Sequence, residues 1–172
     1  ELYIGMGDTA EILAKDLDIS RDDQETFSIK SHEKALAAIK DGKFQNEIIP
    51  VDINETIISE DEGPRTPDVD KIKSLEPAFD IEGSITAATS SPISIGAAAT
   101  VVMGKEKAED LGVALKFKIR SRAVAGVDWR RMGTGPLPAT EKALKKAKLS
   151  MDDIETIELN EAFAAQSLYV IR

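Results

Sequence analysis

The chain has 172 residues, of which 22 are Lys or Arg and 31 are Asp or Glu, so its net charge is −9. This length allows one full domain or parts of two, and the 42% share of hydrophobic residues can supply a buried core. The acidic balance argues against a nucleic-acid-binding surface, which needs a basic stripe, and no apolar run in the sequence is long enough to span a membrane. Because the sequence contains no cysteine, disulfides, thiolate metal sites and cysteine nucleophiles are excluded within it.

The charge is divided unevenly along the chain. Residues 1–82 carry 9 basic and 21 acidic side chains (−12), and residues 83–172 carry 13 and 10 (+3), which together give −9. A shift of this size indicates two regions with different surroundings. Two interpretations stay open: a solvated acidic face on the first region, or a functional asymmetry between the two.

The first region is predicted to be largely helical. Asp8 followed three residues later by Glu11 is typical of a capping box at a helix start. Ser20 marks a second start, and Asp41-Gly42 ends the long amphipathic helix that follows. One face of this helix carries four residues: Phe27, Ser31, Ala35 and Ala38.

Shorter elements follow this helix. The β-branched runs at 48–51 and 57–58 predict a small hairpin. Residues 60–67 contain two prolines and a glycine and are predicted to be a loop. A short helix through residues 69–75 is expected to stop before Pro77.

The second region alternates predicted strands with predicted helices, which favours α/β layers built from βα units. Four strands are expected, at 85–89, 100–103, 113–126 and 154–159. The third has the period-two alternation of a half-buried strand. Three helices are expected, at 106–111, 139–148 and 162–171. Because the last helix is apolar and has no cap, we expect the chain to be cut out of something longer.

Several polar residues are candidates for function. His32 is the single histidine, and its place within a helix favours a structural or surface role over catalysis. The alternating basic residues at 116–122, with Arg130 and Arg131, form either a solvated face or a phosphate site. Arg65 in a proline-glycine loop is well placed to contact a ligand, and Ser90-Ser91 beside small residues leaves room for a polar one.

Asn160 and Glu161 stand between a predicted strand and the start of the last helix. Exposed amides and the helix dipole favour negative charge at such a position. The amide of Asn160 could therefore hold a water or donate to an oxyanion. It could equally be the N-cap of the helix, and the residues alone leave both roles open.

Eight sequence blocks, in the same order and spacing, resemble thiolases across nearly the whole chain. They are Met6-Gly7-Asp8-Thr9-Ala10-Glu11, Ser31-His32-Glu33-Lys34-Ala35, Asp61-Glu62-Gly63-Pro64-Arg65, Leu75-Glu76-Pro77-Ala78-Phe79, Thr86-Ala87-Ala88-Thr89-Ser90-Ser91, Val124-Ala125-Gly126-Val127-Asp128, Met132-Gly133-Thr134-Gly135-Pro136 and Asn160-Glu161-Ala162-Phe163-Ala164-Ala165-Gln166. The chain is most similar to the group of acetyl-CoA acetyltransferases and 3-ketoacyl-CoA thiolases.

The resemblance implies a thiolase-like α/β fold of layered α-β-α-β-α form, of which this chain holds the loop domain and parts of two α/β halves. Residues 1–82 would be most of the loop domain that covers coenzyme A. Residues 83–112 would end the N-terminal half, and residues 113–172 would begin the C-terminal half.

The resemblance also implies roles for individual residues. Six of them correspond to contacts with the adenine or pantetheine part of CoA: Met6, Arg65, Leu75, Phe79, Ala87 and Ser91. Phe163 corresponds to a residue lining the pantetheine channel. Asn160 corresponds to the catalytic Asn that positions a water beside an oxyanion hole.

The reaction implied is ping-pong Claisen chemistry, in which a Cys takes the acyl group, a His activates it and a second Cys moves protons. Neither cysteine is in this sequence, and the family's catalytic His would lie after Arg172, so we expect an inactive central fragment of an acyl-CoA C-acyltransferase. Alternatives are a thiolase-like, non-catalytic protein that binds CoA or acyl groups, and an acidic α/β interaction domain.

The remaining expectations concern partners. We expect CoA and acyl-CoA as substrates, no covalently bound cofactor and no metal. We expect no nucleic-acid or membrane partner. We expect the complete protein to be a homodimer or homotetramer that is located in the cytoplasm.

Overall fold

The computed structural model describes residues 3–114 and 116–172, which divide into two compact units. The first unit comprises the chain up to Pro92, Val127–Thr134 and Glu158–Arg172, and the second comprises Ile93–Gly126 and Gly135–Ile157. The predicted division at residues 82 and 112 is a different one, and it stays a prediction.

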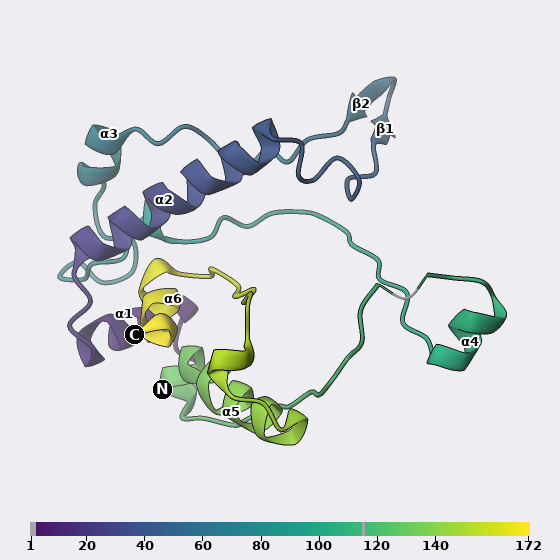
Figure 1. Cartoon of the computed structure of the whole chain (residues 1–172). Helices are drawn as coiled ribbons and strands as arrows, with labels where there is room; N and C mark the ends of the chain where they lie inside the picture. Colours follow the sequence, from purple (N-terminus) through teal and green to yellow (C-terminus); the bar gives the residue numbers. More distant parts are fainter. Residues whose placement is uncertain (1–2, 115) are drawn as a thin grey trace. The chain divides into compact units, whose positions relative to one another are not determined.

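The first unit is mainly helical (Figure 1). Its elements are the helices α1 (Met6–Asp16), α2 (Arg21–Lys40), α3 (Val69–Lys73) and α6 (Ala164–Ile171), the strands β1 (Val51–Ile53) and β2 (Thr56–Ile58), and the 3₁₀ turns η1 (Ala87–Thr89) and η2 (Trp129–Thr134). Helix α6 packs against both α1 and α2, and η2 packs against α1.

Local capping signals explain where the first two helices begin. The prediction that Asp8 starts α1 is wrong, because the N-cap is Gly5 and the carboxylate of Asp8 accepts a hydrogen bond from the Gly5 amide at 3.1 Å. The prediction for α2 is confirmed, since Ser20 Oγ accepts from the Asp23 amide at 3.1 Å. Gly42 follows α2 with φ +69°, a conformation that glycine adopts without steric cost.

The predicted hairpin, loop and short helix are also present. Strands β1 and β2 pair in antiparallel fashion with Val51 opposite Ile58, although β1 begins later than the predicted run. Residues 60–67 contain no helix or strand. Helix α3 begins after Asp68, whose side chain accepts from the Lys71 amide at 3.1 Å.

The second unit contains α4 (Lys105–Asp110), α5 (Pro136–Ala147) and the turn η3 (Met151–Asp153). The predicted helices at 106–111 and 139–148 are thus confirmed with shifted ends. Helix α5 begins three residues earlier than predicted because Pro136, whose fixed φ suits the first helical position, stands at its start.

The four strands predicted for the second region are absent from the described residues. A strand exists only when a neighbouring strand accepts and donates its ladder hydrogen bonds, and residues 100–103, 113–126 (apart from 115) and 154–159 have no such neighbour in the described parts of the chain. Their apolar side chains are exposed instead, as at Val101 and Phe117, which are 80% and 93% accessible.

Residues 85–89 contain η1 (Ala87–Thr89) instead of a strand because their threonines bond locally. Thr86 Oγ1 accepts from the Ala88 amide at 3.2 Å, and Thr89 Oγ1 accepts from the Thr86 amide at 2.9 Å. Such short side-chain contacts offer the backbone an alternative to a sheet ladder. This segment is therefore a tight turn.

A buried carboxylate connects α1 to the segment before η1. Glu11 is only 3% exposed, and it accepts hydrogen bonds from the Ser84 amide at 3.0 Å, from the Ser84 hydroxyl at 3.2 Å and from the Ile85 amide at 2.8 Å. Ile85 is fully buried and packs with Ala10, Ala14, Ile19 and Ala165 in the core. Glu11 therefore supplies the acceptor that a buried stretch of backbone requires.

Replacing this carboxylate should destabilise the protein. Each buried N–H left without an acceptor costs about 1–3 kcal/mol, so Glu11→Ala should lower the free energy of unfolding by at least about 2 kcal/mol. The measurement is urea unfolding of the full gene product, meaning the chain together with any residues that its gene encodes on either side.

The control is Glu141→Ala, which removes an exposed carboxylate on α5 and should change stability by less than about 0.5 kcal/mol. An unfolding midpoint for Glu11→Ala equal to that of the control would show that the carboxylate does not support the Ser84–Ile85 backbone.

Candidate functional site

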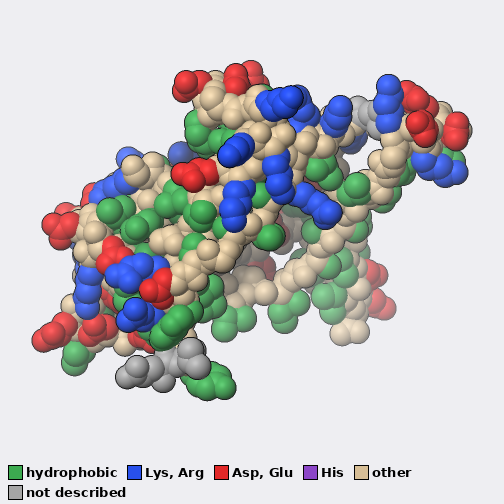
Figure 2. Space-filling view, turned by 90° about the horizontal axis from the view of Figure 1, so that it is seen from below, with side chains coloured by type: hydrophobic (Ala, Val, Ile, Leu, Met, Phe, Trp, Pro, Cys, Tyr) green, Lys and Arg blue, Asp and Glu red, His purple; other side chains and the backbone are tan. Residues whose placement is uncertain are grey.

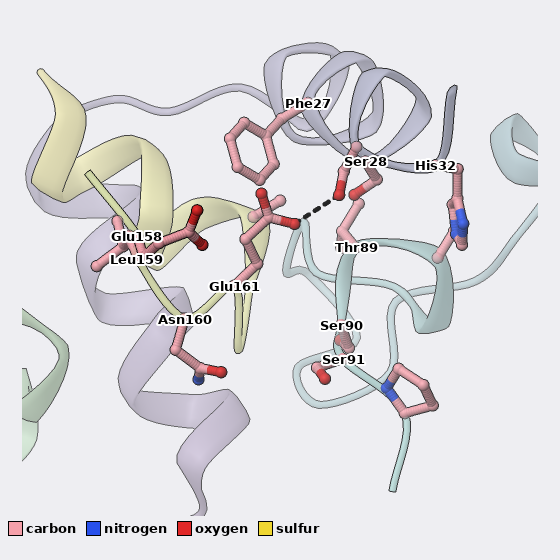
Figure 3. Close-up of a pocket in the computed structure, with 14 residues that line it drawn as sticks. Phe27, Ser28, His32, Thr89, Ser90, Ser91, Glu158, Leu159, Asn160 and Glu161 are labelled. Carbon is pink, nitrogen blue, oxygen red and sulfur yellow. Dashed lines mark hydrogen bonds between the residues drawn. The ribbon is translucent and has the colours of Figure 1, made fainter. Parts of the chain in front are cut away.

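A cavity of about 590 Å³ lies in the first unit, between α2 and two irregular segments (Figure 3). Its lining residues are Phe27, Ser28, Ser31 and His32 of α2, Ala88, Thr89, Ser90, Ser91 and Pro92, and Glu158, Leu159, Asn160, Glu161 and Ala164. Hydroxyl groups and carboxylates are prominent in this lining, so the cavity suits a ligand that carries hydrogen-bonding groups.

The Ala88–Pro92 wall is fixed by contacts just before it. Gln24 of α2 is fully buried, and its Nε2 donates at 2.9 Å to the hydroxyl of Ser84, which Glu11 also holds. Ser90 Oγ then donates to the Thr86 carbonyl at 2.8 Å. These bonds place Ser90 and Ser91 at the cavity without any strand to support them.

The wall at 158–161 is attached to both other walls. The Ser91 amide donates to the Ala162 carbonyl at 2.9 Å, and Ser90 pairs with Phe163 in an isolated antiparallel bridge. On the other side, Ser31 Oγ of α2 donates to the carboxylate of Glu161 at 2.6 Å. Three segments that are far apart in the sequence therefore meet at this cavity.

Two of the predicted site residues form an aromatic pair. The rings of Phe79 and Phe163 meet edge to face, with centroids 5.8 Å apart, which is a favourable geometry for aromatic rings. Gly7 lies against the Phe79 ring, and a Cβ at this position would clash with the ring atoms. Glycine is therefore required at position 7 for the ring to sit where it does.

Asn160 lines the cavity, but it is not a helix cap. Helix α6 begins at Ala164 and its N-cap is Phe163, so the capping role considered for Asn160 is wrong. The reason is that Ala162 and Phe163 bond to Ser91 and Ser90, and Phe163 is extended, so the helix starts only after them. Within the described residues, the exposed side chain of Asn160 makes no hydrogen bond.

The other predicted site residues lie outside the cavity lining. Met6 is the exposed first residue of α1, and Ala87 is exposed in η1. The carbonyl of Leu75 accepts from Arg21 of α2 at 2.6 Å. Exposed Arg65 is attached to α2 through its amide, which donates to Nδ1 of His32 at 3.4 Å.

Ion pairs connect elements of the first unit. A hydrogen bond from Arg172, assisted by Ser20, holds the pKa of Asp23 below its usual value, and Arg172 lies 2.8 Å from that carboxylate. Likewise, a hydrogen bond from Arg131 lowers the pKa of Asp16, and this pair joins η2 to α1. Both aspartates therefore stay charged to lower pH than a free aspartate.

Basic side chains gather on the face of the molecule shown in Figure 2. In the second unit, Lys142 and Lys146 of α5 donate to the carbonyls of Val124 and Arg122 at 3.4 and 3.1 Å. These lysines thus lie beside the basic segment at 116–122, whose side chains are exposed. The solvated face and the phosphate site both stay predictions for this segment.

Neither a metal site nor a membrane-spanning helix is found in the described residues. Within 3–114 and 116–172, no group of three or more His, Asp and Glu side chains is placed to hold a metal ion. None of the helices in the described parts of the chain combines the length and the hydrophobicity that crossing a membrane requires.

Sequence reasoning assigned no role to Ser31 or to the side chain of Glu161. Ser31 does share a predicted helix face with Phe27, and both residues line the cavity. Its four-residue spacing from Phe27 was therefore the available signal. No sequence signal pairs Ser31 with Glu161, because they are 130 positions apart.

Comparison with known proteins establishes the family. The sequence model described as thiolase, N-terminal domain, matches residues 3–106, and that of the thiolase, C-terminal domain, matches residues 113–172. The chain therefore belongs to the thiolase family, as its sequence blocks predict.

Individual relatives agree with this assignment. The 3-ketoacyl-CoA thiolase of Bacillus subtilis (strain 168) is 45% identical over 186 residues, which cover 100% of this chain and 48% of the relative. That of Aliivibrio fischeri (strain ATCC 700601 / ES114) is 49% identical over 175 residues, which cover 97% of this chain and 45% of the relative. The chain thus spans just under half the length of these curated relatives.

Solved structures confirm the predicted thiolase-like α/β fold. The crystal structure of the Bacillus anthracis acetyl-CoA acetyltransferase matches with a TM-score of 0.94 and 42% identity, over 97% of this chain and 44% of the other. The acetyl-CoA acetyltransferase from Syntrophomonas wolfei matches with a TM-score of 0.89 and 36% identity, over 99% and 43%.

Proposed function

We propose that the chain is the central part of an acyl-CoA C-acyltransferase, which cleaves 3-ketoacyl-CoA by thiolysis and catalyses the reverse Claisen condensation. The observation that carries this proposal is the match of two thiolase domains along the chain. The names of the relatives, 3-ketoacyl-CoA thiolase and acetyl-CoA acetyltransferase, support the substrate class.

Asn160 is the proposed catalytic residue of this segment. In the condensation and its reverse, negative charge develops on a thioester oxygen as a carbon–carbon bond forms or breaks. A water oriented by the Asn160 amide would donate a hydrogen bond to that oxygen. Two observations support this role: the side chain lines the cavity, and it is exposed and makes no hydrogen bond within the described residues.

The proposed CoA contacts are the seven residues that the family resemblance implies: Met6, Arg65, Leu75, Phe79, Ala87, Ser91 and Phe163. The edge-to-face pair of Phe79 and Phe163 supports an apolar surface for the pantetheine arm. The proximity of Ser91 to Phe163, through the bonded pair of segments, supports a shared channel.

We also propose the substrates, the oligomeric state and the location of the complete protein. CoA and acyl-CoA would be its substrates, with no covalently bound cofactor. A homodimeric or homotetrameric state and a cytoplasmic location belong to the proposal as implications of the family. Exposed apolar side chains on the extended segments, such as Val101 and Phe117, support a larger assembly or a longer chain that covers them.

A non-catalytic CoA-binding or acyl-binding protein is the second candidate. The observation that favours it is the absence of cysteine from the sequence. The two candidates differ in one measurable property, which is turnover of 3-ketoacyl-CoA. Only the first candidate has it.

The isolated 172-residue chain should cleave no acetoacetyl-CoA, because a thiolase needs a thiolate nucleophile and the chain has none. The full gene product should release acetyl-CoA from acetoacetyl-CoA and CoA. A spectrophotometric thiolysis assay compares the two. Turnover by the isolated chain that survives repurification would contradict the fragment assignment, and CoA binding without turnover by the full gene product would favour the second candidate.

Arg65→Ala in the full gene product should raise KM for CoA by about tenfold and leave kcat nearly unchanged. A contact with the nucleotide end of CoA is equally present in the ground and transition states, so its loss weakens binding alone, and tenfold corresponds to about 1.4 kcal/mol. The control is Lys43→Ala, which removes an exposed cation that follows α2 and belongs to none of the candidate sites. A fall in kcat with unchanged KM would place Arg65 outside the CoA contacts.

Asn160→Asp should lower kcat by about 10²–10³ while the melting temperature stays unchanged. Loss of one oxyanion-hole donor costs this much in rate, and a carboxylate would also repel the developing oxyanion. The side chain is exposed and caps no helix, so folding should not depend on it. Steady-state thiolysis and thermal unfolding of the full gene product measure both, and a normal kcat would remove Asn160 from the mechanism.

A further inference from the structure

The side chains of Asn160 and Glu161 point to opposite sides of the segment that joins them (Figure 3). The Glu161 carboxylate points to α2, where it accepts the Ser31 hydroxyl at 2.6 Å, and the Asn160 amide points away from α2. Residues 158–161 belong to no helix, and adjacent side chains of such a segment point to different sides of it. Fixing the direction of Glu161 therefore also fixes the direction of Asn160.

The hydrogen bond itself is of the strong kind. An O–H donor and a carboxylate acceptor at 2.5–2.7 Å form a charge-assisted bond, and the 2.6 Å separation falls in this range. A serine inside a helix commonly bonds the carbonyl one turn earlier, whereas Ser31 donates to a residue 130 positions away. Its hydroxyl is thus committed to the Asn160 segment.

Other hydrogen bonds hold the residues after Glu161, and among the described residues none of the side-chain hydrogen bonds involves Asn160 itself. The Ala162 carbonyl accepts from the Ser91 amide, and Phe163 pairs with Ser90. Within the described residues, the Ser31 bond is the side-chain hydrogen bond nearest to Asn160 along this segment. Without it, the backbone of residues 160 and 161 could rotate while the contacts at residues 162 and 163 remained.

We propose that Glu161, held by Ser31, is a positioning residue that aims the Asn160 amide at the reacting thioester. This inference rests on the proposed function. Ser31 lies in the part of the chain matched by the thiolase N-terminal domain, and Glu161 lies in the part matched by the C-terminal domain. The bond therefore makes the geometry of a C-terminal catalytic residue depend on a helix of the N-terminal match.

The test uses thiolysis by the full gene product with variants of both partners. Ser31→Ala and Glu161→Ala should each lower kcat by about tenfold or more, since small misplacements of a reacting group can cost up to about 10²-fold. KM for CoA should change by less than about twofold, because a loss confined to the transition state appears in kcat. Ser31→Ala is a mild change on a helix, so it keeps the test valid if Glu161→Ala fails to fold.

Conservative variants separate positioning from a merely structural role. Ser31→Thr keeps the hydroxyl, and Glu161→Gln keeps a carbonyl acceptor, so each should retain kcat within about threefold, allowing for the loss of charge in the second. The double variant Ser31→Ala/Glu161→Ala should be no slower than the slower single variant, because both changes remove one interaction. Glu33→Ala removes an exposed carboxylate from the same helix and is the matched control.

The outcomes are distinct. Reduced kcat in the alanine variants with melting temperatures within a few degrees of the wild type supports the positioning role. Wild-type kcat in Ser31→Ala and in folded Glu161→Ala overturns it while leaving the proposed function intact, as does a lower melting temperature with unchanged kcat. An absence of thiolysis by the wild-type gene product overturns the proposed function itself, and the positioning role with it.

Discussion

The buried carboxylate of Glu11 is the contact on which the candidate site depends. By accepting the amides of Ser84 and Ile85, it lets an irregular stretch of backbone enter the core without a sheet to satisfy its hydrogen bonds. Because Ile85 is thereby fixed against α1 and α6, the residues that follow can turn back through η1 and present Ser90 and Ser91. A carboxylate in a helix thus replaces the ladder that the sequence pattern would have led one to expect.

The hydrogen bonds of Glu11 lead to the cavity through a series of further contacts. Ser90 and Ser91 pair with Phe163 and Ala162, which delays the start of α6 to Ala164. The residues before them then lie outside the helix, with Glu161 directed to α2 and Asn160 directed away from it. The exposed amide that the proposed chemistry requires is therefore a consequence of backbone pairing and of one side-chain contact on its neighbour.

Sequence patterns predicted those elements whose signals are local. The serine cap of α2, the glycine after it and the hairpin at 51–58 all depend on residues within a few positions of each other, and each is present. The strand predictions were wrong because a strand requires a partner strand, and the alternation of residue types at 113–126 cannot show whether a partner is available. The strand predicted at 85–89 is absent for another reason. Threonine hydroxyls accept hydrogen bonds from backbone amides within this segment, so the amides need no partner strand.

The candidate site was predictable only in part for the same physical reason. Family blocks indicated Asn160, Ser91 and Phe163, which do meet around one region. The spacing from Asp8 predicts a capping role for Glu11, and no local pattern reveals its bonding partners, which are 73 and 74 residues away. The Ser31 contact to Glu161 spans 130 positions, so no window of sequence contains it.

The most direct measurement is a crystal structure of the full gene product with CoA bound. We expect the pantetheine arm to lie beside Phe79, Ser91 and Phe163, with its sulfur end directed to the Asn160 amide and the Ser31–Glu161 hydrogen bond intact. CoA bound away from these residues, or an Asn160 side chain turned toward α2 with Glu161 released from Ser31, would contradict the proposed site.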